Sequence, residues 1–304
     1  MTPLHLVPEL APYQDEPAQL PSGSLGKDAR LRLRFERRGE KSILSHMERK
    51  APLLVQRAIY CDEGLPGIPW VFIITNSGGI LQGDRYQIKI EAGPGAIGHV
   101  TSQAATKIHE MDANFAAQEQ EIILEENSYL EYLPDQIIPF RHSRFLTRTR
   151  LNVDPTATLL YSEILMAGRK YYGDGESFEF DLFSSTVRAE RPGGKTLFAE
   201  KYVIEPHALS PRELGVMGDY DVFGNVILLT PKIHAEAIFA KVRPSFDRSL
   251  PWVEGVSRLP NDAGLIFKVL ARESSIARAR IREFWSIVRP VVAGSPVPAE
   301  FLWR

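Results

Sequence analysis

Short segments of alternating apolar and charged residues are the feature that most restricts the fold of this chain. In one of them Leu31, Leu33 and Phe35 share one face of an extended segment, while charged side chains share the other. The alternation returns at 86–90 and 178–182, denser apolar runs stand at 121–124 and 226–229, and turns containing Gly or Pro separate them at 93–95, 154–155, 173–175 and 191–195. Many short strands joined by frequent turns are typical of an all-β body. We therefore expect a mainly β fold and not a doubly wound α/β sheet.

Helical spacing is confined to two places. From Ser274 to about Val288 the apolar residues recur so that they fall on one side of a helix, and a serine at its start can cap it. Pro290 is expected to end this C-terminal helix, because proline has no N–H with which to continue the hydrogen bonds. A second helix is predicted near 232–242. We expect the C-terminal helix to pack on the sheet, and we assign it no catalysis.

The first 28 residues differ in composition from the remainder. Prolines at 3, 8, 12, 17 and 21 and a Ser-Gly stretch near the end of this segment disfavour both a helix and a strand ladder. We expect residues 1–28 to be a flexible, Pro-rich tail. No composition break follows, so residues 29–304 are predicted to form a single β domain with a C-terminal helical segment.

Charge and cysteine content exclude several classes of protein. With 36 basic and 38 acidic side chains the formal net charge is −2, so no global field draws the chain to nucleic acid or to an anionic membrane. Cys61 is the single cysteine, which excludes a disulfide framework and a thiolate cluster. No secretory leader and no apolar run near the ~20 residues of a membrane span is present. We expect a soluble cytoplasmic protein.

The stretch 77–85 looks like a phosphate-binding loop but lacks its chemistry. It follows an apolar run at 70–74 that is predicted to be a strand, and it contains Gly78, Gly79 and Gly83. A phosphate loop needs Lys and Ser or Thr after its last glycine and then a helix. Here Asp84 follows the glycine, and the residues after it alternate as a strand does. The loop is predicted to join two strands and to present an acidic group, without a nucleotide.

Motifs for metal binding or catalysis are sparse. The seven histidines form neither His-x-x-x-His nor His-Glu-x-x-His, so the sequence contains no recognisable closed metal site. A site of imidazoles and carboxylates that assembles only in space remains open for His99 and His109; the alternative is that both are structural or surface histidines. Paired carboxylates could instead serve glycoside hydrolysis, and the candidates for such a pair are Asp84, Glu131, Asp135 and Glu176.

Six separated stretches match one protein family in order and spacing. They are LLVQRAIY at 53–60, SGGILQGD at 77–84, TSQAATK at 101–107, LEYLPDQIIPF at 130–140, GR at 168–169 and GESF at 175–178. Together they resemble the urease accessory protein UreD, called UreH in some systems, over roughly residues 29–304. The resemblance implies a β-helix-like body of many strands with a few helices. It also implies a non-enzymatic maturation factor that works with UreF and the GTPase UreG on apo-urease.

The resemblance further implies a scaffold and nickel conduit. Nickel would be transient cargo, GTP would be hydrolysed by UreG, and the assembly would be dimeric through a complex that contains UreF. The motif match implies a polar inner passage lined by Asp84, Thr106 and Glu176, with Lys107 and Arg169 as charge balance. His99 and His109, the histidines considered above as possible metal ligands, are added to this passage as further nickel contacts.

Other interpretations of the same residues stay open. Asp84 could cap a turn, Thr106 could bond the backbone and Glu176 could pair with Arg169, since buried carboxylates need such partners in any case. For the whole chain the alternatives are a β-helical carbohydrate-active enzyme that uses paired carboxylates, and a pure adaptor without metal contact.

Overall fold

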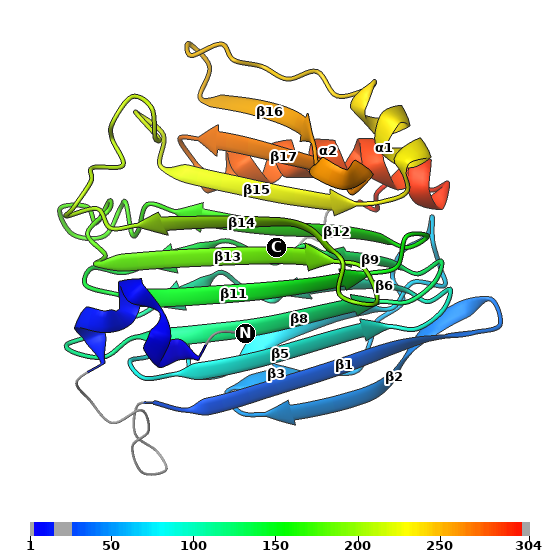
Figure 1. The fold of residues 1–304 in the computed structure, drawn as a ribbon, viewed down its shortest axis with the longest axis horizontal. Helices are drawn as coiled ribbons and strands as arrows, with labels where there is room; N and C mark the ends of the chain where they lie inside the picture. The colour runs from blue at the N-terminus through cyan, green and yellow to red at the C-terminus, as the bar shows by residue number, and fades with distance from the viewer. Residues whose placement is uncertain (1–2, 15–25, 300–304) are drawn as a thin grey trace.

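The computed structural model describes residues 3–14 and 26–299, and its body consists of two large β-sheets stacked face to face (Figure 1). The seven-stranded sheet has the spatial order β14 (Thr196–Ile204), β13 (Leu182–Glu190), β11 (Arg144–Val153), β8 (Ala116–Leu124), β5 (Arg85–Ala92), β1 (Asp28–Arg38) and β2 (Lys41–Lys50).

The ten-stranded sheet lies behind it in this view. Its main path is β16 (Trp252–Arg258), β17 (Gly264–Ala271), β15 (Val222–Leu229), β12 (Thr158–Met166), β9 (Tyr129–Tyr132), β6 (Ile97–Ser102), β4 (Trp70–Thr75) and β3 (Leu53–Val55), and the short strands β7 (Thr106–Ile108) and β10 (Ile137–Pro139) join it at the side. The helical elements are the α-helices α1 (Lys232–Phe239) and α2 (Ser274–Ala293) and the 3-10 helices η1 (Leu4–Leu6), η2 (Pro8–Tyr13) and η3 (Pro260–Asp262).

The chain alternates between the two sheets from β4 to β13. Each pass adds a strand parallel to the preceding strand of the same sheet, which gives the parallel series β1, β5, β8, β11, β13 in one sheet and β4, β6, β9, β12 in the other. Antiparallel strands complete the edges. The prediction of a mainly β fold with a few helices and a C-terminal helix is therefore confirmed. The narrower β-helix-like description stays a prediction.

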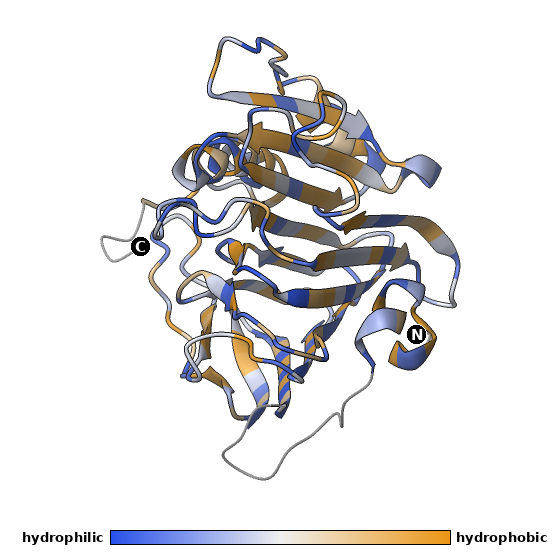
Figure 2. Ribbon diagram, turned by 90° about the vertical axis from the view of Figure 1, so that its left-hand side faces the viewer, coloured by the Kyte–Doolittle hydropathy of each residue, from blue (hydrophilic) through white to orange (hydrophobic). Residues whose placement is uncertain are grey.

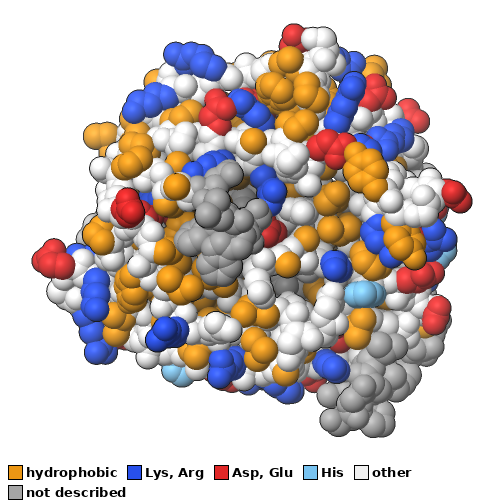
Figure 3. All heavy atoms as spheres, turned by 180° about the vertical axis from the view of Figure 1, so that it is seen from behind, with side chains coloured by type: hydrophobic (Ala, Val, Ile, Leu, Met, Phe, Trp, Pro, Cys, Tyr) orange, Lys and Arg blue, Asp and Glu red, His pale blue; other side chains and the backbone are white. Residues whose placement is uncertain are grey.

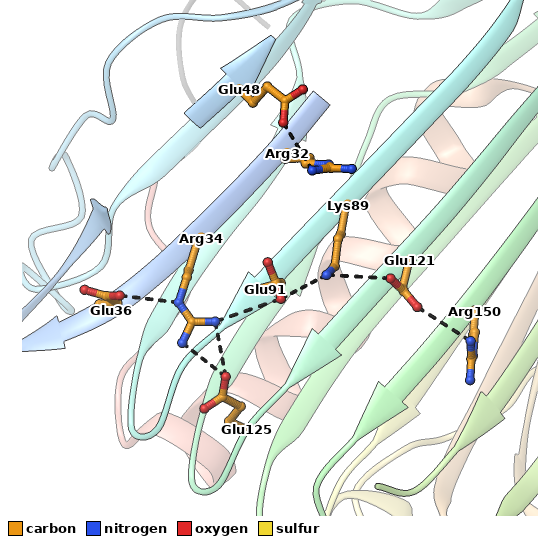
Figure 4. Close-up of polar contacts among 9 residues, drawn as sticks. All are labelled: Arg32, Arg34, Glu36, Glu48, Lys89, Glu91, Glu121, Glu125 and Arg150. Atoms are coloured by element: carbon orange, nitrogen blue, oxygen red, sulfur yellow. Dashed lines mark hydrogen bonds and ion pairs between the residues drawn. The ribbon is translucent and has the colours of Figure 1, made fainter. Parts of the chain in front are cut away.

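Period-two alternation sends one face of the seven-stranded sheet to solvent. In β1 the apolar residues are buried and the arginines between them are exposed or half-buried, and strands banded in this way are visible in Figure 2. Across the outer face Arg34 lies 3.2 Å from Glu125, Lys89 lies 3.1 Å from Glu91, and further pairs continue to β11 (Figure 4). Because these pairs are open to solvent on one side, each stabilises the fold little. These charged side chains make the outer face of the seven-stranded sheet polar. The opposite, apolar face of the sheet therefore lies in the interior of the protein.

Two hydrophobic cores lie on opposite faces of the ten-stranded sheet. The larger one fills the space between the sheets, where side chains such as Leu33 and Ile122 meet Leu130 and Leu159. The second one lies between the outer face of the ten-stranded sheet and α2, which contributes Ile281, Phe284 and Val288 among other residues. The α2 side of the molecule is seen in Figure 3, where hydrophobic side chains are interspersed with charges of both signs. Helix α2 thus packs on the sheet, as its amphipathic spacing predicts.

Residues 3–14 differ from the expected extended tail. They form η1 and η2, which pack on the outer face of the seven-stranded sheet, where β8, β11 and β13 begin (Figure 1). Leu10 is fully buried against Phe115 and Leu182, and Glu9 accepts a hydrogen bond of 2.7 Å from the Ser184 hydroxyl. Proline permits this because its fixed φ suits the first turn of a helix, as at Pro8. Residues 15–25, which belong to the same predicted tail, lie outside the described residues.

Two predicted element boundaries are wrong. Helix α2 continues through Pro290 to Ala293 and ends at Gly294, whose left-handed φ of 65° and N–H bond to the Pro290 carbonyl close it. Apolar packing on the second core continues past the proline and outweighs the one lost hydrogen bond. The segment 178–182 is not a strand before Leu182, because Phe178 has a φ of 63°. Helix α1 is found where the sequence predicts it.

Candidate functional site

The loop 77–85 joins β4 to β5, as the sequence predicts, and Asp84 is its anchor. The Asp84 carboxylate is fully buried and accepts hydrogen bonds from the backbone N–H groups of Lys27 (2.8 Å) and Leu81 (2.9 Å) and from the Tyr86 hydroxyl (3.2 Å). Three donors are enough to satisfy a buried carboxylate. This arrangement corresponds to the alternative interpretation in which Asp84 has a structural role. Asp84 therefore caps its own turn.

Glu176 is fixed in the same manner by arginine. Arg169 donates two hydrogen bonds to its carboxylate, of 2.6 and 2.5 Å, and Arg141 donates a third of 2.8 Å. Burial alone would raise the pKa of Glu176, but the hydrogen bonds from Arg169 and Arg141 outweigh burial and lower it. Gly168 makes this loop possible, since a Cβ there would lie 2.0 Å from the Glu176 carbonyl oxygen. Glu176 thus has the predicted Arg169 partner.

A cavity of about 220 Å³, called here the inner cavity, lies between the two sheets. Thr106 and Lys107 line it, together with the backbone of Gly78 and Gly79 from the glycine loop, so this part of the predicted passage is brought together. The loop must approach closely here, because a Cβ at Gly79 would collide at 2.7 Å with the His109 ring and the Lys107 carbonyl.

Glu163 is an acidic residue of the inner cavity that the sequence analysis missed. Its carboxylate accepts hydrogen bonds from the hydroxyls of Tyr202 (2.6 Å) and Ser185 (2.9 Å). Burial raises the pKa of Glu163, because neither hydroxyl supplies the positive charge that ionisation of the buried carboxyl requires. Side chains alternate between the two faces of the sheet along β12, and Glu163 is on the face toward the seven-stranded sheet. This position cannot be predicted without knowing which strands pair.

A second cavity of about 340 Å³, the helix cavity, lies between the ten-stranded sheet and α2. His99 and Trp70 line it from the sheet, and Arg278, Arg282 and Trp285 line it from α2. The His99 ring stacks on Trp70 with ring centroids 3.6 Å apart. The predicted residue His99 therefore lies on a different cavity from Thr106 and Lys107.

A fully buried polar network stands behind His99. Glu131 contacts His99 Nδ1 at 2.7 Å and accepts hydrogen bonds from the Tyr129 hydroxyl (2.5 Å) and from Trp285 Nε1 (2.7 Å). Arg289 of α2 lies 3.4 Å from Glu131 and donates a hydrogen bond to Asp62. Although burial opposes its ionisation, the contacts with His99 and the charge of Arg289 lower the pKa of Glu131.

The network places two carboxylates and one guanidinium beneath the helix cavity. Asp62 and Glu131 share the single positive charge of Arg289, and His99 is a further partner of Glu131. The sequence analysis missed Arg289. It lies four residues after Trp285, so a helix that continues past Val288 places the arginine on its apolar side, and this spacing could have indicated a buried arginine.

The two cavities meet at an interruption of the ten-stranded sheet. The β9–β12 ladder stops at the pair Tyr132–Tyr161, and pairing with β12 resumes only at Ile137–Leu165 through β10. Between these points the segment 133–136 follows β6 and β7 instead, with backbone hydrogen bonds of 3.0 Å from Leu133 N–H to the Val100 carbonyl and 2.9 Å from Thr106 N–H to the Gln136 carbonyl. This interruption in strand pairing, which we call the sheet window, is bordered by residues that line both cavities: Pro134, Asp135, Ser162 and Ile164.

The other predicted residues are not part of these cavities. Asp84, Glu176 and His109 are absent from the linings of both, and His109 packs on Phe140 with ring centroids 4.9 Å apart. Of the four carboxylates considered for glycoside hydrolysis, Asp84, Glu131 and Glu176 are held by structural donors and only Asp135 faces a cavity. Within residues 3–14 and 26–299, no group of three His, Cys, Asp or Glu side chains is placed to hold a metal ion.

Comparisons with known proteins agree on one family. The family described as UreD urease accessory protein matches residues 27–304. The chain is 57% identical over 295 residues to the urease accessory protein UreD 2 of Brucella suis, covering 97% of this chain and 98% of that protein. It is 52% identical over 297 residues to the urease accessory protein UreD of Photorhabdus laumondii, covering 98% of this chain and 92% of that protein. In the part of the chain that the structure describes, no helix has the length and apolarity needed to cross a membrane. This chain belongs to the UreD family of urease accessory proteins.

Proposed function

We propose that this protein is the scaffold and nickel conduit of a urease maturation complex. It acts in the cytoplasm with UreF and the GTPase UreG on apo-urease, in an assembly that is dimeric through UreF. Nickel is the cargo, and GTP is hydrolysed by UreG. Membership of the family of urease accessory proteins supports the maturation role, and the loop that ends in Asp84, whose acidic group is unsuited to phosphate, agrees with a nucleotide on the partner.

The observation that carries the conduit is the sheet window. Its bordering residues line both a cavity between the sheets and a cavity beneath α2, which supports a path through the ten-stranded sheet that uses the two cavities in turn. The polar groups along this path that can bind a metal ion include the Thr106 hydroxyl, the carboxylate of Asp135 and the imidazole of His99, while Lys107, Arg278 and Arg282 add positive charge to the linings. Nickel accepts oxygen and nitrogen ligands, and a path that offers few of them at any one point can pass the ion on without trapping it.

The path carries charges of both signs. The buried carboxylate of Glu131 lies behind His99 and Asp135 borders the window, whereas Arg278 and Arg282 line the helix cavity from α2. A buried carboxylate is screened little, so it attracts a divalent ion in the neighbouring cavity more strongly than a surface carboxylate does.

The test blocks the sheet window without removing a charge. Ser162 is buried and borders both cavities, so in Ser162→Phe the ring fills the window, whereas Ser162→Ala leaves it open and removes only the hydroxyl. Each variant is expressed with UreF, UreG and the urease subunits under limiting nickel, and urease activity, urease nickel content and co-purification of the complex are measured.

We expect Ser162→Phe to assemble normally but to lower urease nickel content and activity severalfold, and Ser162→Ala to match the parent protein. Normal activation by a folded, assembled Ser162→Phe protein would reject the conduit and favour a pure adaptor. A drop in both variants would instead point to the hydroxyl.

A further inference from the structure

We propose that Asp135 and Arg278 form a releasable gate at the sheet window: Asp135 is a transient binding site for a divalent cation, and Arg278 occupies that carboxylate when no cation is present. The role of this gate in delivery rests on the conduit proposed above, whereas cation binding at Asp135 can be tested without it.

Asp135 is placed where any ion in the window must pass. It lines both cavities, and its side chain is only 12% exposed. Its backbone is held in position, because its N–H donates a 2.8 Å hydrogen bond to the Ser102 hydroxyl. A carboxylate on a fixed backbone at the junction of two cavities can meet an ion from either side.

The partner of Asp135 is held much less firmly than the other buried carboxylates are. Arg278 Nη1 lies 3.6 Å from the Asp135 carboxylate, which is an ion pair but longer than a hydrogen bond. The Arg278 side chain is 42% exposed, so its charged group can return to water at little cost. By contrast, Arg289 is fully buried and donates a hydrogen bond to Asp62, so its departure would leave a buried charge without a partner.

These properties define what the gate would bind. A divalent ion brings twice the charge of the guanidinium and can use the carboxylate together with water, so it can displace Arg278. When the ion leaves, Arg278 returns and neutralises Asp135. The arginine thus keeps the site weak, which a conduit requires.

The experiment measures binding of Ni²⁺ to the purified full-length chain by equilibrium dialysis, in the absence of partners. In Arg278→Gln the competing charge is gone, and we expect Ni²⁺ affinity to rise about fivefold or more, since about fivefold is the effect of removing a unit charge at about 4 Å from another in bulk water and the effect grows as the site is shielded from water. Arg278→Lys keeps the charge and is the matched control, expected to stay near the parent protein. In Asp135→Asn, and in the double variant Asp135→Asn with Arg278→Gln, this binding should be lost.

The outcomes separate this proposal from the conduit. If Asp135→Asn binds Ni²⁺ as the parent protein does, or if Arg278→Gln and Arg278→Lys have equal affinity, the gate is refuted even where Ser162→Phe still blocks urease activation. If the affinities change as expected but Ser162→Phe activates urease normally, Asp135 is a cation site and the conduit fails. Should both hold, Arg278→Gln is further expected to lower urease activation under limiting nickel, because the ion is held too long.

Discussion

Replacing Arg289 by Met tests whether the network behind His99 holds α2 on the sheet. Arg289 is fully buried, and its single positive charge lies against Asp62, to which it donates a hydrogen bond, and against Glu131, 3.4 Å away. Methionine fills a similar space but leaves both carboxylates without their positive partner. Removing one member of a buried ion pair destabilises a protein by about 3–5 kcal/mol. At roughly 2–4 °C per kcal/mol for a large domain, the melting temperature should fall on the order of 10 °C.

The assay is urea unfolding followed by tryptophan fluorescence, together with thermal unfolding by circular dichroism. Two further variants sharpen it. Arg258→Met removes an arginine that makes two hydrogen bonds to Glu236 on the exposed surface, and its unfolding midpoint should match that of the parent protein. Asp62→Asn combined with Arg289→Met removes both charges and should recover part of the loss. A loss for Arg289→Met below about 1 kcal/mol would refute the reasoning, since it would mean that the buried charges need no partner.

Two other features of the structure give predictions for stability. Burial raises the pKa of Glu163 above its ordinary value of 4.5, so the stability associated with its protonated form is fully present below pH 4.5 and is lost as the pH rises through the higher folded-state pKa. Glu163→Gln should therefore stabilise the protein at pH 8 and have little effect at pH 4. The measurement is the free energy of unfolding in urea at the two pH values. An equal gain in this free energy at both pH values would contradict the prediction. Gly168→Ala should destabilise the protein by about 3 kcal/mol or more, because its Cβ would overlap the Glu176 carbonyl at 2.0 Å. Gly173→Ala is the control, since it shares a positive φ but meets no atom within 4 Å, and equal melting temperatures for the two variants would show that the clash relaxes without cost.

The local parts of the fold could be predicted from the sequence, and the long-range parts could not. Alternation over 30–36 and helical spacing after Ser274 each depend on neighbouring residues, and both correspond to elements of the structure. The sheet window instead depends on strands that meet from distant parts of the chain, namely β9, β10 and β12. No spacing in the sequence places Ser162 beside Pro134. For the same reason Glu163 and Arg278 were missed as cavity residues, whereas Thr106 was reached through a family motif and His99 through the search for histidines that could bind a metal.

The carboxylates that stand out most in the sequence are poor candidates for a passing ion, and the reason is general. Asp84 and Glu176 each accept three hydrogen bonds from neighbouring groups. A buried carboxylate needs such donors to stay ionised, but every donor must be displaced before a cation can bind. An ion in transit therefore requires a carboxylate that is shielded from water and only loosely paired, a combination that Asp135 has through its 3.6 Å contact with a half-exposed arginine. The strength of the existing partner, rather than the prominence of the acidic residue in a motif, is the property by which to choose between carboxylates along the path.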